Sequence, residues 1–241
     1  MRINKALIQS FIAEFLCSFI FGYTVYAAIL NAKNPIYTAT QVSVPLAIGF
    51  CAIAIIYTFV DHTVCHFNPA ITLSAIITLK IPFLIGIGYI IAQIVGFIAA
   101  VGMVICNFSL GYNSTINAIV PGKVDPDTTN TGLFFTEFVL TGILVFVAFE
   151  NGINSKRNPN HSFYGDMEQV DRSIVVPLTI GLTLGFLAFL GSSTSGSVFN
   201  PGLVFASNLI GGTWPFAWQF YVSQFTGGLL GALIQVWILF K

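Results

Sequence analysis

The chain has 241 residues, of which 56% are hydrophobic and only 7% are charged, and its formal net charge is zero. A mean hydropathy of +0.86 is typical of a membrane protein, because a soluble domain needs a charged coat. The absence of excess positive charge argues against nucleic-acid binding.

Crossing the apolar core of a bilayer takes roughly 20 residues, and six apolar segments approach that length. They are 7–30, 42–60, 83–106, 132–150, 174–191 and 216–240. The first follows Arg2 and Lys5 and has no small-residue cleavage pattern, so we interpret it as a retained span and not as a signal peptide. The pattern predicts an all-α protein that sits in a lipid bilayer.

Two further apolar pieces, 69–79 and 201–210, are too short to span. Each begins at an Asn-Pro pair, Asn68-Pro69 and Asn200-Pro201. Asn caps the first turn of a helix, and Pro fits the first helical position without loss of a hydrogen bond. These pieces are therefore predicted to be half-helices that enter the membrane partway, which requires that protein or a wet cavity covers their irregular ends.

Basic residues predict the orientation, because Lys and Arg accumulate on the cytoplasmic side. With both termini cytoplasmic, seven basic residues fall inside and two, Lys33 and Lys123, fall outside. The seven are Arg2, Lys5, Lys80, Lys156, Arg157, Arg172 and Lys241. The linker 107–131 is then extracellular, and it contains two glycosylation sequons, at Asn107 and Asn113, whose use the pattern leaves open. The target membrane is the plasma membrane or an internal one.

The sequence contains an internal repeat. Phe67-Asn68-Pro69-Ala70 returns as Phe199-Asn200-Pro201-Gly202 after 132 residues, and 44–49 matches 176–181 at the same interval. We predict one domain over 1–241, with a first repeat at about 7–106 and a second at about 132–240. Three spans per repeat is an odd number, so the second repeat must be inverted, which places a shared site near the membrane midplane.

The paired Asn-Pro motifs predict a pore. Two other Asn-Pro dipeptides, at Asn34 and Asn158, lie in polar loops where a turn explains them. Half-helices that enter from opposite faces bring two positive dipole ends together. The amides of Asn68 and Asn200 would then donate to a passing water oxygen, while the dipoles oppose cations and protons.

Two glutamates, Glu14 and Glu137, occupy matching places in the repeats. As intramembrane carboxylates they would suit a proton relay, but their placement favours a structural role, in which each accepts hydrogen bonds from the irregular backbone beside its half-helix. Gln93 and Gln224 recur at an interval of 131 residues and suit the same work.

The remaining polar residues do not indicate an enzyme. His66 is expected to face the pore as a hydrogen-bonding group, without the convergent partners that a metal site needs. Cysteine spacing predicts neither a disulfide framework nor a metal site, the four being Cys17, Cys51, Cys65 and Cys106. No nucleophile-base pair or phosphate-binding loop is evident, so we predict no enzymatic activity and no cofactor.

The chain resembles the aquaporin family of water and glycerol channels. The resemblance rests on 13–16, on 66–70, on 89–93 and on the Gly227-Gly228 region. It implies six spans and two half-helices in an inverted repeat, one pore per subunit, and a homotetramer that passes water and small neutral solutes. The pore motifs it implies are Asn68, Pro69, Ala70, Asn200, Pro201 and Gly202, the last in place of the usual Ala.

The same resemblance locates the selectivity filter at Ile48, Ala188, Ser197 and Leu203. Typical members have Arg where this chain has Leu203, and water-selective members have His where it has Ala188. A ring without Arg loses hydrogen-bond donors and a charge that opposes cations. A wider ring admits glycerol, whereas an apolar ring dewets, and the sequence leaves these alternatives open. Mercurials block many members at the position of Ser197, so Cys65 is an alternative pore-lining target.

The leading hypothesis is a passive channel for water and small uncharged solutes such as glycerol. Two alternatives remain open. The first is a non-conducting or gated membrane scaffold whose apolar filter stays closed. The second is a channel that leaks ions or weak acids because the filter Arg is missing.

Overall fold

The computed structural model describes residues 4–33, 40–108, 110–153 and 175–239, and its regular elements there are helical. Short π-helical turns, η1 (Phe149–Ile153) and η4 (Ile234–Leu239), continue α6 and α9. The helices are α1 (Lys5–Ala32), α2 (Thr40–Phe59), α3 (Pro69–Ile77), α4 (Phe83–Asn107), α5 (Tyr112–Ile119), α6 (Asn130–Ala148), α7 (Val176–Leu190), α8 (Pro201–Gly211) and α9 (Ala217–Leu233).

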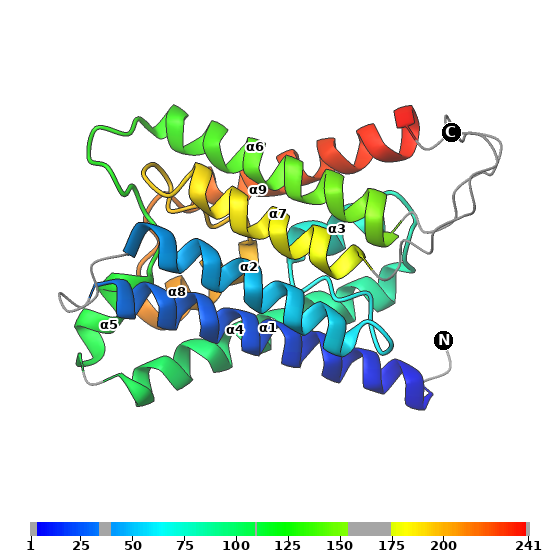
Figure 1. Cartoon of the computed structure of the whole chain (residues 1–241), viewed down its shortest axis with the longest axis horizontal. Coiled ribbons are helices and arrows are strands. Elements are labelled where there is room, and N and C mark those ends of the chain that lie inside the picture. Colours follow the sequence, from blue (N-terminus) through cyan, green and yellow to red (C-terminus); the bar gives the residue numbers. More distant parts are fainter. Residues whose placement is uncertain (1–3, 34–39, 109, 154–174, 240–241) are drawn as a thin grey trace.

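The long helices run side by side along one direction of the molecule (Figure 1). We call the end where α1 begins and η4 finishes the terminal end, and the opposite end, which carries α5, the α5 end. The short helix α3 lies in the half of the bundle toward the terminal end, and α8 lies in the other half (Figure 1). The two predicted half-helices therefore occupy opposite halves.

Within the described part of the chain, five helices are long and apolar enough to cross a membrane: Lys5–Ala32, Val42–Phe59, Phe83–Asn107, Asn130–Ile153 and Ala217–Leu239. The span predicted at 174–191 corresponds to α7, which has 15 residues and covers roughly 22 Å at 1.5 Å per residue. Residue 174 lies outside the described residues. Within the linker, the structure adds the eight-residue α5, which the apolar pattern did not predict.

Helix packing follows the repeat. In the first half α1 packs along α4, and in the second half α6 packs along α9 in the same way. α2 and α7 pack against each other across the two halves. Each half-helix also contacts a long helix of the other half, α3 against α9 and α8 against α4. The predicted inverted arrangement of three plus three spans with two half-helices is confirmed.

Glycines allow the closest of these contacts. A Cβ atom added to Gly227 or Gly231 of α9 would overlap the main-chain carbonyls of Phe138 and Gly142 of α6. Small residues let transmembrane helices approach until their backbones touch, and this proximity brings the polar side chains of α9 within reach of α6.

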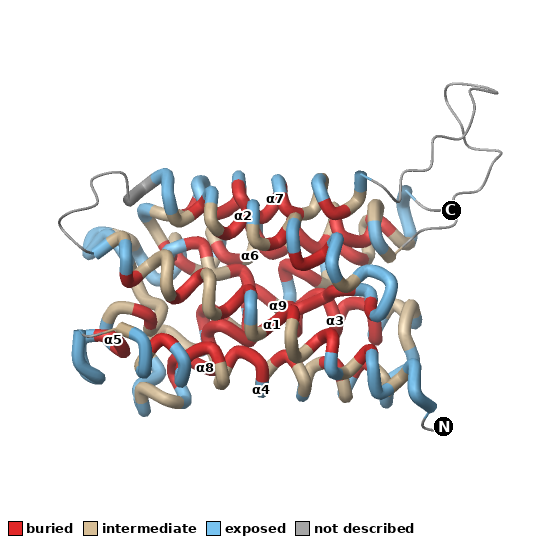
Figure 2. The backbone as a smooth tube through the Cα atoms, turned by 60° about the horizontal axis from the view of Figure 1, so that its bottom comes forward, coloured by how far each residue is buried: buried red, intermediate tan, exposed pale blue. Residues whose placement is uncertain are grey.

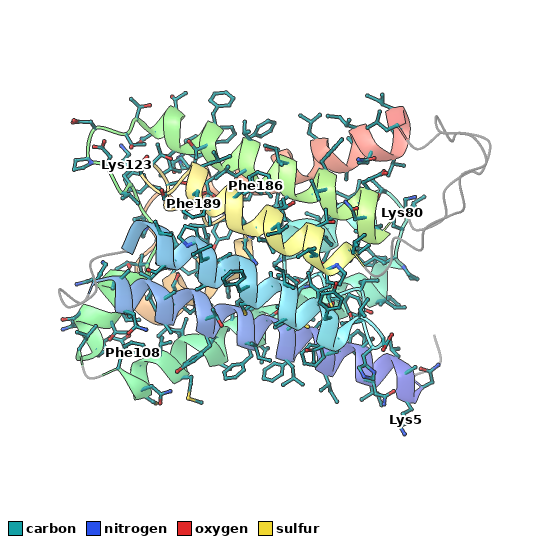
Figure 3. The ribbon with its side chains drawn as sticks, in the orientation of Figure 1. Lys5, Lys80, Phe108, Lys123, Phe186 and Phe189 are labelled. Atoms are coloured by element: carbon teal, nitrogen blue, oxygen red, sulfur yellow. The ribbon has the colours of Figure 1, made fainter. Side chains whose placement is uncertain are left out.

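The outer surface of the bundle is apolar. Buried residues line its interior, while exposed ones lie on the outward turns (Figure 2). Phe186 and Phe189 of α7 are exposed by 44% and 41% (Figure 3). Trp218 lies in the first turn of α9, at the α5 end, and Trp237 lies in η4, toward the terminal end; both are exposed. Exposed Trp near both ends of an apolar bundle is typical of membrane-water interfaces.

Candidate functional site

The two Asn-Pro motifs start the half-helices in the same way. The Oδ1 atom of Asn68 accepts a hydrogen bond from the amide of Ala70 at 2.9 Å, and that of Asn200 accepts one from Gly202 at 3.0 Å. The prolines occupy the beginning of each helix, where a missing N–H costs nothing. Both motifs are buried.

The same two asparagines also tie the halves together. The Nδ2 of Asn68 donates to the carbonyl oxygen of Phe199 at 2.9 Å, and the Nδ2 of Asn200 donates to the carbonyl oxygen of Phe67 at 2.9 Å. Each amide group carries two hydrogens, so each keeps a second hydrogen that a small molecule can accept. The positive ends of both half-helix dipoles meet at this place.

The chain before each motif has an unfavourable backbone conformation. Cys65 and Phe67 have φ angles of 51° and 30°, and their repeat counterparts Ser197 and Phe199 have 56° and 32°. Left-handed conformations of this kind cost non-glycine residues about 1–3 kcal/mol each and persist only where surrounding contacts impose them.

Glu14 supplies such contacts in the first half. Its fully buried carboxylate accepts hydrogen bonds from the amides of His66 and Phe67, both at 3.0 Å. It also accepts from the hydroxyl of Thr63 at 2.5 Å and from the Nε2 of Gln93 at 2.8 Å. Four donors match the acceptor capacity of an ionised carboxylate.

Glu137 repeats this arrangement in the second half. It accepts from the amides of Val198 and Phe199 at 3.0 and 2.7 Å. The hydroxyl of Ser195 donates at 2.5 Å, and the Nε2 of Gln224 donates at 2.7 Å. Each glutamate already accepts four hydrogen bonds, most of them from the segment that precedes the Asn-Pro motif of its own half. This geometry therefore favours the structural role over a proton relay.

Thr63 and Ser195 are site residues that the sequence reasoning missed. They lie 132 residues apart, the interval of the Asn-Pro motifs, and each donates to the glutamate of its half. The shared interval and the shared hydroxyl group were the available signal.

The two halves differ in one series of hydrogen-bonded polar side chains, which is present only in the first half. The Nδ1 of His66 lies 3.1 Å from the hydroxyl of Thr72, which also accepts from the Nε2 of Gln93 at 2.9 Å. The positions that correspond to His66 and Thr72 in the second half are Val198 and Val204. The Nε2 of His66 is buried and has no partner among the described residues.

A cavity of about 20 Å³ lies beside the first motif, toward the terminal end. That volume has room for about one water molecule. On one side it is lined by the segment 64–68, which includes Cys65 and His66, and on the other by residues of α6, η1 and α7. The lining residues outside the segment are Ile71, Leu144, Ala148, Gly152, Ile153, Ile180 and Leu184.

The four predicted filter residues are all buried: Ile48 on α2, Ala188 on α7, Ser197 before the second motif and Leu203 on α8. The hydroxyl of Ser197 has no hydrogen-bond partner among the described residues and packs beside Gly191. Their assignment as a constriction stays a prediction.

The model of the family described as "Major intrinsic protein" matches residues 2–235. The chain belongs to the major intrinsic protein family. It is 49% identical over 238 residues to a protein named "Aquaporin" from Enterocytozoon bieneusi, and the match covers 99% of this chain and 98% of the relative. It is also 35% identical to "Aquaporin-B" of Dictyostelium discoideum, covering 95% and 82%.

The X-ray structure of the aquaglyceroporin from Plasmodium falciparum shares the fold, with a TM-score of 0.77, 19% identity and 96% coverage of both chains. The family and the fold class predicted from the sequence are thus confirmed. In this major intrinsic protein, both Asn-Pro motifs, both glutamates and both glutamines converge on one buried polar centre.

Proposed function

We propose that this protein is a passive transmembrane channel for water and small uncharged solutes, glycerol among them. The observation that carries the proposal is the meeting of two half-helix starts, where Asn68 and Asn200 each keep an amide hydrogen and a water-sized cavity lies beside Asn68. The aquaporins and the aquaglyceroporin to which the chain is similar support it.

The chemistry of this centre selects for neutral molecules. A solute oxygen accepts hydrogen bonds from the two asparagines, so it loses little on leaving bulk water. A cation meets two positive dipole ends instead. Glu14 and Glu137 already accept four hydrogen bonds each, which leaves little acceptor capacity for a passing proton.

The predicted filter sets the solute range. A ring of Ile48, Ala188, Ser197 and Leu203 presents a single side-chain hydroxyl and no charge. Because Leu203 is shorter than Arg and binds no water, the ring discriminates mainly by size and hydration, so glycerol passes along with water.

Both termini are cytoplasmic in this proposal, in a single channel domain over 1–241 that assembles as a homotetramer. Lys5 and Lys80 lie at the terminal end and Lys123 at the α5 end (Figure 3), which agrees with the charge rule. The other predicted inner basic residues lie outside the described ones: Arg2, Lys156, Arg157, Arg172 and Lys241.

Osmotic swelling and shrinking of proteoliposomes tests the function. Vesicles that contain the protein should equilibrate water and glycerol faster than protein-free vesicles of the same lipid and size. Planar-bilayer recording should show no current above background. Water permeability equal to that of empty vesicles would refute the proposal, and a cation current would favour the leaky alternative.

A further inference from the structure

The repeat relates the predicted filter to a second set of residues. Residues 44–71 and 176–203 correspond position by position at the constant interval of 132. This interval gives each filter residue a counterpart: Ile180 for Ile48, Ile56 for Ala188, Cys65 for Ser197 and Ile71 for Leu203. Because the repeats are inverted, the counterparts belong on the terminal side of the Asn-Pro motifs. We call Ile56, Cys65, Ile71 and Ile180 the inner set.

The inner set gathers at the cavity beside Asn68. Cys65, Ile71 and Ile180 line this cavity. Ile56 lies next to Cys65, whose sulfur is 4.0 Å from the main-chain carbonyl oxygen of Ile56. The four residues belong to α2, the segment before the first motif, α3 and α7, which correspond in the repeat to the elements that carry the predicted filter. The structure therefore brings the counterparts of the filter residues to one place.

The cavity extends from the polar centre toward the terminal end of the bundle. Asn68 borders it at the centre, and Val64 and Gly152, which are exposed, also line it. Its walls include the buried side chains of Leu144 and Leu184. The space holds about one water molecule, and pore diameter is a main determinant of channel selectivity. A solute that reaches the centre from this end therefore passes a narrow, largely apolar section.

Two side chains of this section can form hydrogen bonds with a solute. His66 lines the cavity, and its buried Nε2 has no partner among the described residues. Asn68 keeps one amide hydrogen. A water molecule can exchange its bonds to bulk solvent for bonds to these groups. Glycerol is larger and has several hydroxyl groups, so more of its hydrogen bonds are lost, and a buried polar group without a partner is costly. The section therefore retards glycerol more than water.

We propose that the inner set forms a second constriction, which retards glycerol more than water and acts in series with the predicted filter. The proposal deepens the proposed channel function and rests on it. Three residues after its Asn, each half carries a bulky aliphatic side chain, Ile71 in the first half and Leu203 in the second. The two constrictions are thus of the same apolar kind, their resistances to glycerol add, and neither alone sets the rate.

Gly152→Ala tests the inner constriction by narrowing it. The added Cβ lies 3.8 Å from the Cδ1 of Ile180 and 4.0 Å from the Cγ1 of Val176, which are ordinary contacts, so the variant should fold. In proteoliposomes its glycerol permeability should fall about fivefold and its water permeability less, because the methyl group occupies the passage beside Ile180. Gly102→Ala, with no atom within 4 Å of its Cβ, is the control. Unchanged glycerol flux in the Gly152 variant would overturn the inner constriction.

Ile71→Val and Leu203→Val, alone and together, test the arrangement in series. Each single variant should raise glycerol flux at most about twofold, because the other constriction remains. The double variant should raise it by more than the product of the two single effects. Ile76→Val is the control, since Ile76 lies on α3 but packs against Gly86 of α4 and does not line the cavity.

Water permeability of the unmodified protein separates the two levels of the proposal. If its vesicles are as tight as empty ones, the channel function fails, and the inner constriction fails with it. If they conduct water, a many-fold rise in glycerol flux from Leu203→Val, together with no effect of Ile71→Val, places the barrier at the filter alone. That result overturns the inner constriction and leaves the channel function standing.

Discussion

The hydroxyl of Tyr26 donates a hydrogen bond to the main-chain carbonyl oxygen of Leu203 at 2.8 Å, across 177 residues of sequence. Both residues are buried. The same carbonyl oxygen also accepts from the hydroxyl of Ser207 at 2.9 Å. Two hydroxyl groups thus hold the first turn of α8, which carries the predicted filter residue Leu203.

Tyr26→Phe should lower the stability of the protein by about 1 kcal/mol, the net worth of a buried hydrogen bond. It should also change the ratio of glycerol to water permeability, because α1 no longer fixes Leu203. Thermal unfolding in detergent and vesicle swelling measure the two effects. Tyr23→Phe, which loses a more exposed contact with Asn107 at 3.2 Å, is the matched control and should change little.

Glu137→Gln should destabilise the protein by about 3 kcal/mol, because a neutral amide places hydrogens against backbone N–H groups and cannot hold four donors. Ser195→Ala removes one of those donors and should cost about half as much. Ser193→Ala, an exposed hydroxyl in the same loop, is the control. The thermal unfolding midpoint in detergent should be lowest for Glu137→Gln, intermediate for Ser195→Ala and unchanged for Ser193→Ala. Equal midpoints for the three variants would contradict a supporting role for Glu137.

Asn68→Asp should retain the helix cap but lose the link to the second half. An Asp oxygen still accepts from the amide of Ala70, while a carboxylate cannot donate to Phe199. A negative charge at the centre also attracts cations. We expect a cation current in bilayer recordings, and a similar current from Asn200→Asp because the geometry is matched. Silent bilayers from both folded variants would show that these residues lie off the conducting path.

Leu203→Arg should reduce glycerol passage more than water passage and leave the protein folded. If Leu203 borders the pore, its replacement enters water, narrows the path and adds a charge. Leu203→Met, similar in size and apolar, should keep the original solute ratio. Swelling rates and size-exclusion profiles report both properties. Aggregation of the Arg variant together with normal behaviour of the Met variant would indicate that Leu203 is core packing.

Gly227→Ala should destabilise the contact between α6 and α9 by about 1–3 kcal/mol, because its Cβ would overlap the carbonyl of Phe138. The control is Gly102→Ala on α4, where no atom lies within 4 Å of the added Cβ. That change should be neutral or slightly stabilising, since Ala favours helix. Thermal unfolding of the two variants side by side checks the contrast.

The predictable part of the site was its repeated part. Asn68 and Asn200, with the glutamates and glutamines, stood out because similar residues recur at nearly constant intervals. Thr63 and Ser195 escaped notice because two small hydroxyl residues differ in type and carry no local signal. The positive φ angles of Cys65 and Phe67 accompany hydrogen bonds from the amides of His66 and Phe67 to Glu14, a residue far away in the sequence, so residue type alone does not encode them. The position of the cavity depends on how closely α6 and α7 approach the segment 64–68.

The reciprocal bonds between the motifs also bear on how the chain is made. The side-chain amide of Asn68 donates to the main-chain carbonyl oxygen of Phe199, and the side-chain amide of Asn200 donates to that of Phe67. When synthesis has reached only the first half, the amide of Asn68 and the carbonyl of Phe67 lie in an apolar setting without these partners, which is costly. The first half-helix therefore gains these two hydrogen bonds only after residues 199 and 200 have left the ribosome. Its folding is completed late, by a segment more than half the chain away.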